Sequence, residues 1–148
     1  MSDVQTASSR TQTAAGNPRA HWPEALQAEY EAGKDSGVVG SVLVSETDRV
    51  RVWHLSIAPG ARCGFHRHVL NYFWTALTDG KARGYFEDGR ITETAHFKGQ
   101  TVHLDFGPGE YMVHSVENIG DTELQFTTVE FLDSPNPKLP IPAHVRLG

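Results

Sequence analysis

An alternation of apolar and polar residues, which begins near residue 38, constrains the fold of this chain more than any other feature. The run 50–58 alternates clearly, and the last alternating run spans residues 122–132. Turn signals recur at short intervals between such runs, among them Asp88-Gly89, which is typical of a tight hairpin. This spacing predicts roughly eight to ten short strands and an all-β sandwich or small barrel.

The segments outside this alternation divide the chain into three parts. Residues 1–20 hold almost no large apolar side chain, so burial cannot offset the entropy of ordering them, and we expect a mobile tail. The barrel domain then spans residues 21–133. It opens with a short helix over 23–33, which begins with a proline and ends with a glycine. Residues 134–148 contain too many prolines to join a central strand, and we expect an extended C-terminal strap.

Charge and composition argue against several classes of function. The 148 residues include 13 basic and 18 acidic side chains, a formal net charge of −5, which does not suit a nucleic-acid partner. No apolar stretch approaches the ~18 residues of a membrane span, and the N-terminus lacks the features of a secretory signal. We therefore expect a cytoplasmic protein. The motifs of serine hydrolases, NTPases and dinucleotide-binding proteins are absent.

A His-Arg-His segment is the most informative part of the sequence. His66 and His68, separated by one residue, point to the same face of a strand. If that face is the barrel interior, both imidazoles converge on one point, as metal coordination requires. His114, which follows the Gly-Pro-Gly turn at 107–109, is the best-placed third ligand. The alternative is that the histidines are ordinary polar residues on a solvated face.

These residues give the chain a resemblance to the cupin family over about residues 38–132. The first cupin motif frames His-x-His with two glycines, and the second is a Pro-x-Gly turn followed by His and Asn. The matching residues are Gly60, His66, His68 and Gly80 in the first motif, and Pro108, Gly109, His114 and Asn118 in the second. The turn of the second motif is displaced by about one residue. The resemblance implies an all-β, cupin-type jelly-roll barrel with a short N-terminal helix.

The resemblance is incomplete at the glutamate of the first motif. That glutamate would fall at Phe73, or at Tyr72 by the other permitted spacing, and neither residue is a carboxylate. The resemblance therefore implies a three-histidine site, His66, His68 and His114, that holds one divalent metal ion. Fe(II) is favoured, and Zn, Ni, Cu or Mn suit the same ligands. Some cupin-type oxygenases, including thiol and diketone dioxygenases, also use three histidines.

The resemblance implies a metal-dependent enzyme with a small-molecule substrate, for which we favour oxidation by dioxygen. The alternative is a non-catalytic ligand-binding or regulatory cupin with a degenerate or structural metal site. The position of Phe73 is expected to discriminate between them, because a ring that fills the cavity leaves no room for substrate. A fainter resemblance, in the Phe-Trp-Thr and Val-Glu-Phe-Leu-Asp-Ser-Pro segments, is to small cupins of β-alanine degradation. Since cupins often pair through their outer sheets, we also expect a homodimer.

Two further residues are candidates for a catalytic role. Arg62 shares the parity of His66 and His68, so it is expected either at the pocket mouth, where it would bind a substrate carboxylate, or on the surface as an ordinary turn arginine. Glu130 lies mid-strand among apolar and β-branched residues. A buried carboxylate there must be paired or coordinating, which makes Glu130 a candidate replacement for the missing acid.

The remaining expectations concern the walls of the pocket. On the strand that follows the His-Arg-His segment, residues with the parity of Phe73 are expected to line the pocket. Those with the parity of Tyr72 are expected to face the other layer. Of His54, His96 and His103, one is expected to line the cavity and the others to lie on the surface.

Overall fold

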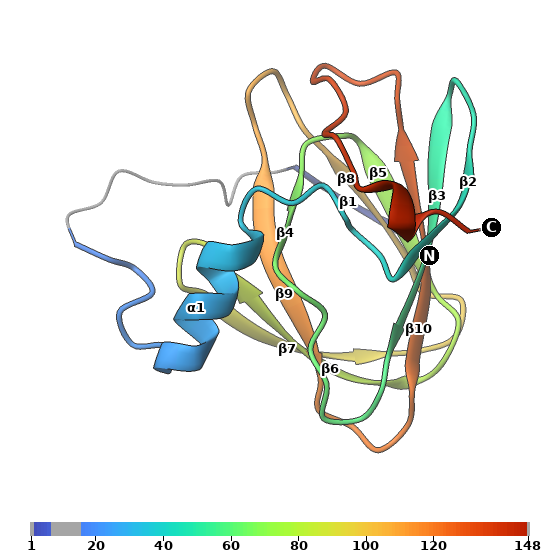
Figure 1. Ribbon diagram of the computed structural model, residues 1–148. Coiled ribbons are helices and arrows are strands. Elements are labelled where there is room, and N and C mark those ends of the chain that lie inside the picture. Colours follow the sequence, from blue (N-terminus) through green and yellow to red (C-terminus); the bar gives the residue numbers. More distant parts are fainter. Residues whose placement is uncertain (1, 7–15, 148) are drawn as a thin grey trace.

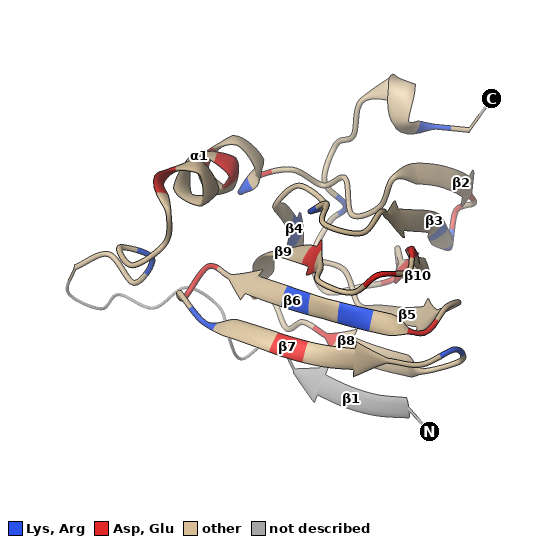
Figure 2. Cartoon of the chain, turned by 90° about the horizontal axis from the view of Figure 1, so that it is seen from below, with Lys and Arg blue, Asp and Glu red and all other residues tan. Residues whose placement is uncertain are grey.

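Two facing β-sheets form the body of the molecule, which is described here from a computed structural model covering residues 2–6 and 16–147 (Figure 1). The strands of the larger sheet are β1 (Ser2–Thr6), β2 (Val42–Glu46), β3 (Val50–Ile57), β5 (Tyr72–Ala76), β8 (Thr101–Asp105) and β10 (Leu124–Phe131). Those of the smaller sheet are β4 (His66–His68), β6 (Gly80–Phe86), β7 (Ile91–His96) and β9 (Met112–Asn118). The strand orders are β1-β8-β5-β10-β3-β2 and β4-β9-β6-β7. Figure 2 shows β6 and β7 in one layer in front of β5 and β8 in the other.

The predicted alternation is confirmed in the strands that form the centre of the larger sheet. Every second residue of β3 and of β10 is buried. The two strands pair antiparallel with Leu124 opposite Ile57 and Phe126 opposite Leu55, so their apolar side chains lie side by side on the inner face. Burial of this apolar face against the smaller sheet stabilises the sandwich and leaves an interior in which a site can be built.

The Asp88-Gly89 turn joins β6 to β7 as the sequence predicts. Gly89 has a φ of +90°, a conformation that residues with a Cβ rarely adopt. A Cβ at this position would also collide with the Pro18 carbonyl oxygen, so the turn needs glycine for two reasons. The Phe86 N–H donates to the Arg90 carbonyl across the turn, at 3.0 Å. This hairpin carries part of the wall of the cavity described below.

The predicted helix is α1 (Glu24–Gly33), and it packs outside the smaller sheet (Figure 1). Pro23 is its N-cap rather than its first helical residue, and the C-cap is Lys34, one residue beyond the predicted glycine. That glycine is needed because a Cβ there would collide with the Phe65 backbone. The buried cluster between helix and sheet contains Trp22, Leu26, Tyr30, Phe65, Tyr85 and Val113. No helix among the described residues is long and apolar enough to span a membrane.

The N-terminal segment contains a strand that the sequence analysis does not predict. Strand β1 pairs in parallel with β8 at the edge of the larger sheet, with Ser2 opposite Thr101 and Thr6 opposite Asp105. The rest of the predicted tail includes residues 1 and 7–15, which lie outside the described residues, so its mobility stays a prediction.

The C-terminal segment after β10 contributes no strand to either sheet among the described residues. It ends in a short 3₁₀ helix, Ala143–Val145, followed by a single bridge between Arg146 and Leu43. Val145 is buried in a cluster with Leu43 and Trp53, which fastens the strap to the β2–β3 edge of the larger sheet.

Candidate metal centre

The three predicted histidines come together inside the molecule. Strands β4 and β9 pair antiparallel, with His66 directly opposite His114 and with His68 opposite Met112. Because His66 and His68 share one face of β4, all three imidazoles lie on the inner side of the smaller sheet. One nitrogen from each ring lies within 4.8 Å of the others, which is a suitable arrangement for a single metal ion.

The rings are close-packed and differ in exposure. The ring centroids are 4.8 Å apart for His66 and His68, 4.7 Å for His66 and His114, and 5.1 Å for His68 and His114. The side chains of His66 and His68 are buried, whereas His114 is partly exposed. A ligand that enters the interior therefore meets His114 more readily than the other two.

Burial keeps these imidazoles neutral. Desolvation lowers the pKa of His66 to about 4. Desolvation also holds the pKa of both His68 and His114 well below the usual range, and the neighbouring His66 adds to the effect in each case. The Arg90 charge lowers the pKa of His114 further. At neutral pH the three rings therefore keep the lone pairs that metal coordination requires.

The hydrogen bonds of the rings also fit a metal site. The His66 Nδ1 atom lies 2.9 Å from the Gly64 carbonyl oxygen. Because a carbonyl only accepts, Nδ1 carries the proton and donates, which leaves the Nε2 lone pair free. The Nδ1 atom of His68 is buried without a hydrogen-bond partner among the described residues. Buried polar atoms are rarely left unpaired, and this cluster of neutral donors therefore suits a divalent ion.

Tyr72, the second of the two positions that the resemblance allows for the family glutamate, lies beside the histidines. Its ring stacks on the His68 ring with centroids 4.0 Å apart and planes 7° apart, and it lines the same cavity as the histidines. The pocket-wall prediction for this strand is therefore wrong, because Tyr72 and Trp74 face the interior. Phe73 faces outward, with its ring 5.2 Å from the His103 ring and 6.0 Å from that of Phe131. Phe73 neither fills nor lines the cavity, so it does not discriminate between the two functions.

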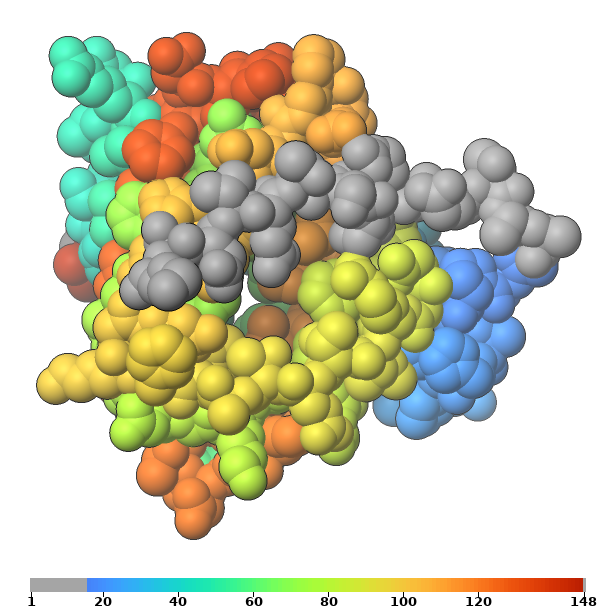
Figure 3. Space-filling model, turned by 180° about the vertical axis from the view of Figure 1, so that it is seen from behind, coloured from blue at the N-terminus to red at the C-terminus, as the bar shows by residue number. Residues whose placement is uncertain are grey.

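A cavity of about 360 Å³ surrounds the histidine cluster. Its walls come from both sheets and combine apolar residues, such as Leu55, Trp74 and Phe126, with polar ones, such as Thr94 and Gln100. No carboxylate lines it among the described residues. Figure 3 shows the face of the molecule that carries the β6–β7 hairpin, which is hollowed beside this hairpin. A small, mostly apolar molecule fits such a space.

Comparison with solved structures identifies the fold. A cupin domain from Bordetella pertussis has 26% sequence identity and a TM-score of 0.52, and the match covers 66% of this chain and 95% of that one. By its structure, this chain is a small cupin. A protein with a double-stranded β-helix domain from Klebsiella pneumoniae matches at 25% identity with a TM-score of 0.47, over 59% of this chain and 66% of that one. Oxalate decarboxylase from Bacillus subtilis matches at 27% identity with a TM-score of 0.44, over 55% of this chain but only 21% of that enzyme.

At the sequence level, no protein-family model and no curated protein matches this cupin. None of the three compared structures is described as a protein of β-alanine degradation, so that link stays a prediction from the sequence.

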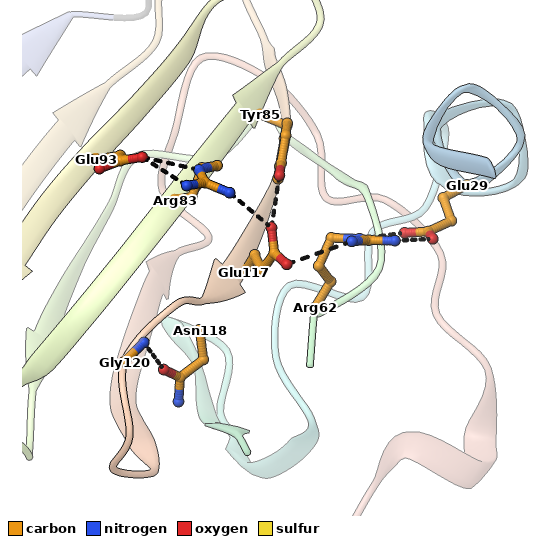
Figure 4. A network of polar contacts seen from close by, with 8 residues as sticks. All are labelled: Glu29, Arg62, Arg83, Tyr85, Glu93, Glu117, Asn118 and Gly120. Atoms are coloured by element: carbon orange, nitrogen blue, oxygen red, sulfur yellow. Dashed lines mark hydrogen bonds and ion pairs between the residues drawn. The ribbon is translucent and has the colours of Figure 1, made fainter. Parts of the chain in front are cut away.

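Arg62 lies outside the cavity of the cupin, so of its two expected positions the structure shows the one on the surface and not the one at the pocket mouth. Its Nε and Nη2 atoms donate to the two Glu29 carboxylate oxygens at 3.0 and 2.6 Å, and Nη1 lies 3.6 Å from Glu117 (Figure 4). Strand β4 begins only at His66, so the parity argument does not extend back to Arg62. The arginine instead connects α1 to the outer face of the smaller sheet.

Glu130 is buried and paired, as a carboxylate in that position has to be. The Trp53 indole N–H donates to its carboxylate at 2.8 Å, and burial raises the pKa of Glu130 to about 7. Glu130 is not among the residues that line the cavity, however. Its bond to Trp53 gives it a structural partner, and its role as a replacement acid stays a prediction.

Of the three other strand histidines, His96 lines the cavity of the cupin, as expected for one of them. The His96 Nδ1 atom lies 2.8 Å from the Gln100 side-chain oxygen. The other two lie on the outer face of the larger sheet, where His54 bonds to Ser56 and the His103 ring packs beside that of Phe73. Arg90 also lines the cavity, and the sequence does not predict this, because a position just after the Asp88-Gly89 turn does not indicate where the side chain points.

Proposed function

We propose that this cupin is a metal-dependent dioxygenase that oxidises a small molecule in the cavity at His66, His68 and His114. The observation that carries the proposal is the convergence of three neutral imidazoles in a cavity that no carboxylate lines among the described residues. Such a ligand set leaves a divalent ion its full charge and open coordination positions, which suits the binding of substrate and dioxygen.

The protein's own residues have three tasks in this proposal. The Gly64 carbonyl orients His66 and fixes its tautomer, and stacking on Tyr72 orients His68. Apolar walls that include Trp74 exclude water and bind the apolar part of a substrate. A bound divalent ion would supply Lewis acidity and, in the case of Fe(II), redox chemistry with dioxygen. We favour Fe(II), while Zn, Ni, Cu and Mn fit the same donors.

Metal content tests the ligand assignment directly. Protein purified without a His tag and treated with Fe(II) under anaerobic conditions should contain about one ion per chain. His66→Ala and His114→Ala should each lose it, because two imidazoles hold a divalent ion weakly. His54→Ala is the matched control, since His54 lies on the outer face of β3 and its imidazole has one hydrogen-bond partner among the described residues, Ser56. Retention of metal in both cluster variants would overturn the three-histidine site.

Oxygen consumption tests the reaction. The Fe(II)-loaded protein should consume dioxygen in the presence of a substrate drawn from a panel of small thiols, diketones and carboxylates, and His114→Ala should not. Fully loaded protein that binds panel members without consuming dioxygen would instead favour the second function.

The second function is a ligand-binding or regulatory cupin whose metal is structural. One specific observation favours it: the aromatic ring of Tyr72, one of the two positions at which the family glutamate would fall, is stacked on His68. In that case metal removal should lower the melting temperature without abolishing a reaction. For either function we propose a cytoplasmic homodimer with no nucleic-acid or membrane partner, and light scattering after size exclusion tests the oligomeric state.

A further inference from the structure

Arg90 is the one formally charged side chain among the described residues that line the cavity. The other polar groups in the lining are imidazoles, hydroxyls and one amide, and the pKa shifts of the imidazoles keep them neutral. Arg90, whose side chain is 46% exposed, therefore supplies the one positive charge in the described lining even before a metal ion is bound. A positive charge in the wall of a cavity attracts and concentrates small anions.

The β6–β7 hairpin holds the Arg90 guanidinium beside the metal centre. The guanidinium carbon lies 4.2 Å above the centre of the Phe86 ring. The Phe86 ring centroid is in turn 5.5 Å from that of His114. One aromatic ring thus contacts both the cation and the most exposed of the three metal-ligand candidates. A substrate bound at the histidines has Arg90 within reach of its other end.

The guanidinium of Arg90 also has free donors. Its only ion pair among the described residues joins Nε to the Asp88 carboxylate at 3.5 Å, and no described side chain accepts from its two Nη groups. Arg62 and Arg83, on the outer face of the same sheet, are instead engaged by Glu29 and Glu93 (Figure 4). A planar guanidinium with free Nη groups is suited to a carboxylate, which it binds through two parallel hydrogen bonds.

We propose that Arg90 binds the carboxylate of the substrate, and that the cavity accepts compact monocarboxylates whose apolar part packs against Leu55, Trp74 and Phe126. The volume of about 360 Å³ is at the small end of ligand pockets, which excludes large acids. Apart from Arg90, no Lys or Arg lines the cavity among the described residues, so a second carboxylate would have no cationic partner there. This inference rests on the proposed function only in taking the histidine cavity as the substrate site.

Calorimetric titration with hexanoate and with its uncharged analogue hexanamide tests this assignment. Protein loaded with Zn²⁺ is used, because Zn²⁺ does not support redox turnover. Wild type should bind hexanoate about tenfold more tightly than hexanamide, and Arg90→Gln should lose about that factor for hexanoate alone. Arg90→Lys should retain part of it, since it keeps the charge without the planar pair of donors. Arg83→Gln is the matched control, with the same charge change on the outer face of the same hairpin.

Three results would overturn the assignment: equal binding of hexanoate by wild type and Arg90→Gln, equal loss in Arg83→Gln, or no preference of wild type for the acid over the amide. The metal content of each variant is measured in parallel. Arg90→Gln should keep its metal, so a loss of hexanoate binding cannot be assigned to an empty histidine site. Protein that binds no metal and still discriminates the acid through Arg90 would overturn the proposed function and leave this inference standing.

Discussion

At the scale of single residues, Tyr72 defines the difference between this site and one that includes a glutamate. Its ring is stacked against His68, close enough that a carboxylate at the same position would face the same metal. Tyr72→Glu should therefore tighten Zn²⁺ or Fe(II) binding by roughly tenfold, because it adds a charged oxygen ligand to three neutral ones. Phe73→Glu is the control, since Phe73 faces away from the cavity. A competition titration with a chelator measures both, and an equal effect of the two substitutions would contradict the placement of Tyr72.

The same residues show how far single positions could be predicted. His66 and His68 were placed correctly because two residues apart on one strand share a face whatever the rest of the fold does. The inward position of Phe73 and the pocket-mouth alternative for Arg62 both fail, because each extends the parity of β4 across an irregular segment at one of its ends. No sequence pattern predicts that Arg90 faces the cavity. The turn before it sets the path of the backbone but does not determine which way the next long side chain points.

At the scale of elements, the β6–β7 hairpin positions Phe86 and Arg90 through its glycine turn. Gly89→Ala should lower the free energy of unfolding by at least roughly 2 kcal/mol, because it combines an unfavourable positive φ with a collision against the Pro18 carbonyl. Gly99→Ala is the matched control, since Gly99 has a φ of +91° but open space around its Cβ position. It should cost only about 1–2 kcal/mol. Urea unfolding measures both, and equal losses would show that the contact with Pro18 is unimportant.

Most elements were predictable because their apolar residues alternate, and burial of one face is a strong local constraint. Strand β1 was not predictable by the same reasoning. Its segment has almost no large apolar residue, and it joins the larger sheet by backbone pairing with β8, which leaves no hydrophobic pattern in the sequence. The exact ends of α1 were also missed by a residue, as expected where capping depends on local contacts such as that of the helix with Phe65.

At the scale of the whole molecule, the buried Glu130 makes stability depend on pH. Its carboxylate accepts a hydrogen bond from Trp53, and this bond and the Arg51 charge lower its pKa, whereas the Glu46 charge raises it. Desolvation is the largest effect and raises the pKa of Glu130 to about 7. Since the folded pKa lies above the unfolded value near 4.5, the unfolded chain releases this proton first. Glu130 therefore lowers the free energy of unfolding progressively as pH rises from about 4.5 to 7, and above that range the loss is constant.

Glu130→Gln keeps the shape and an acceptor for the Trp53 N–H while removing the titration. Relative to wild type, this variant should gain stability steadily between about pH 4.5 and 7, by about 3 kcal/mol at most, and the difference should be constant above pH 7. The histidine cluster is the same in both proteins, so its own titration largely cancels in the difference. Urea unfolding of the two metal-free proteins at intervals of half a pH unit measures it. A difference that does not change with pH would mean that Glu130 is already ionised in the folded protein at pH 5, despite its burial.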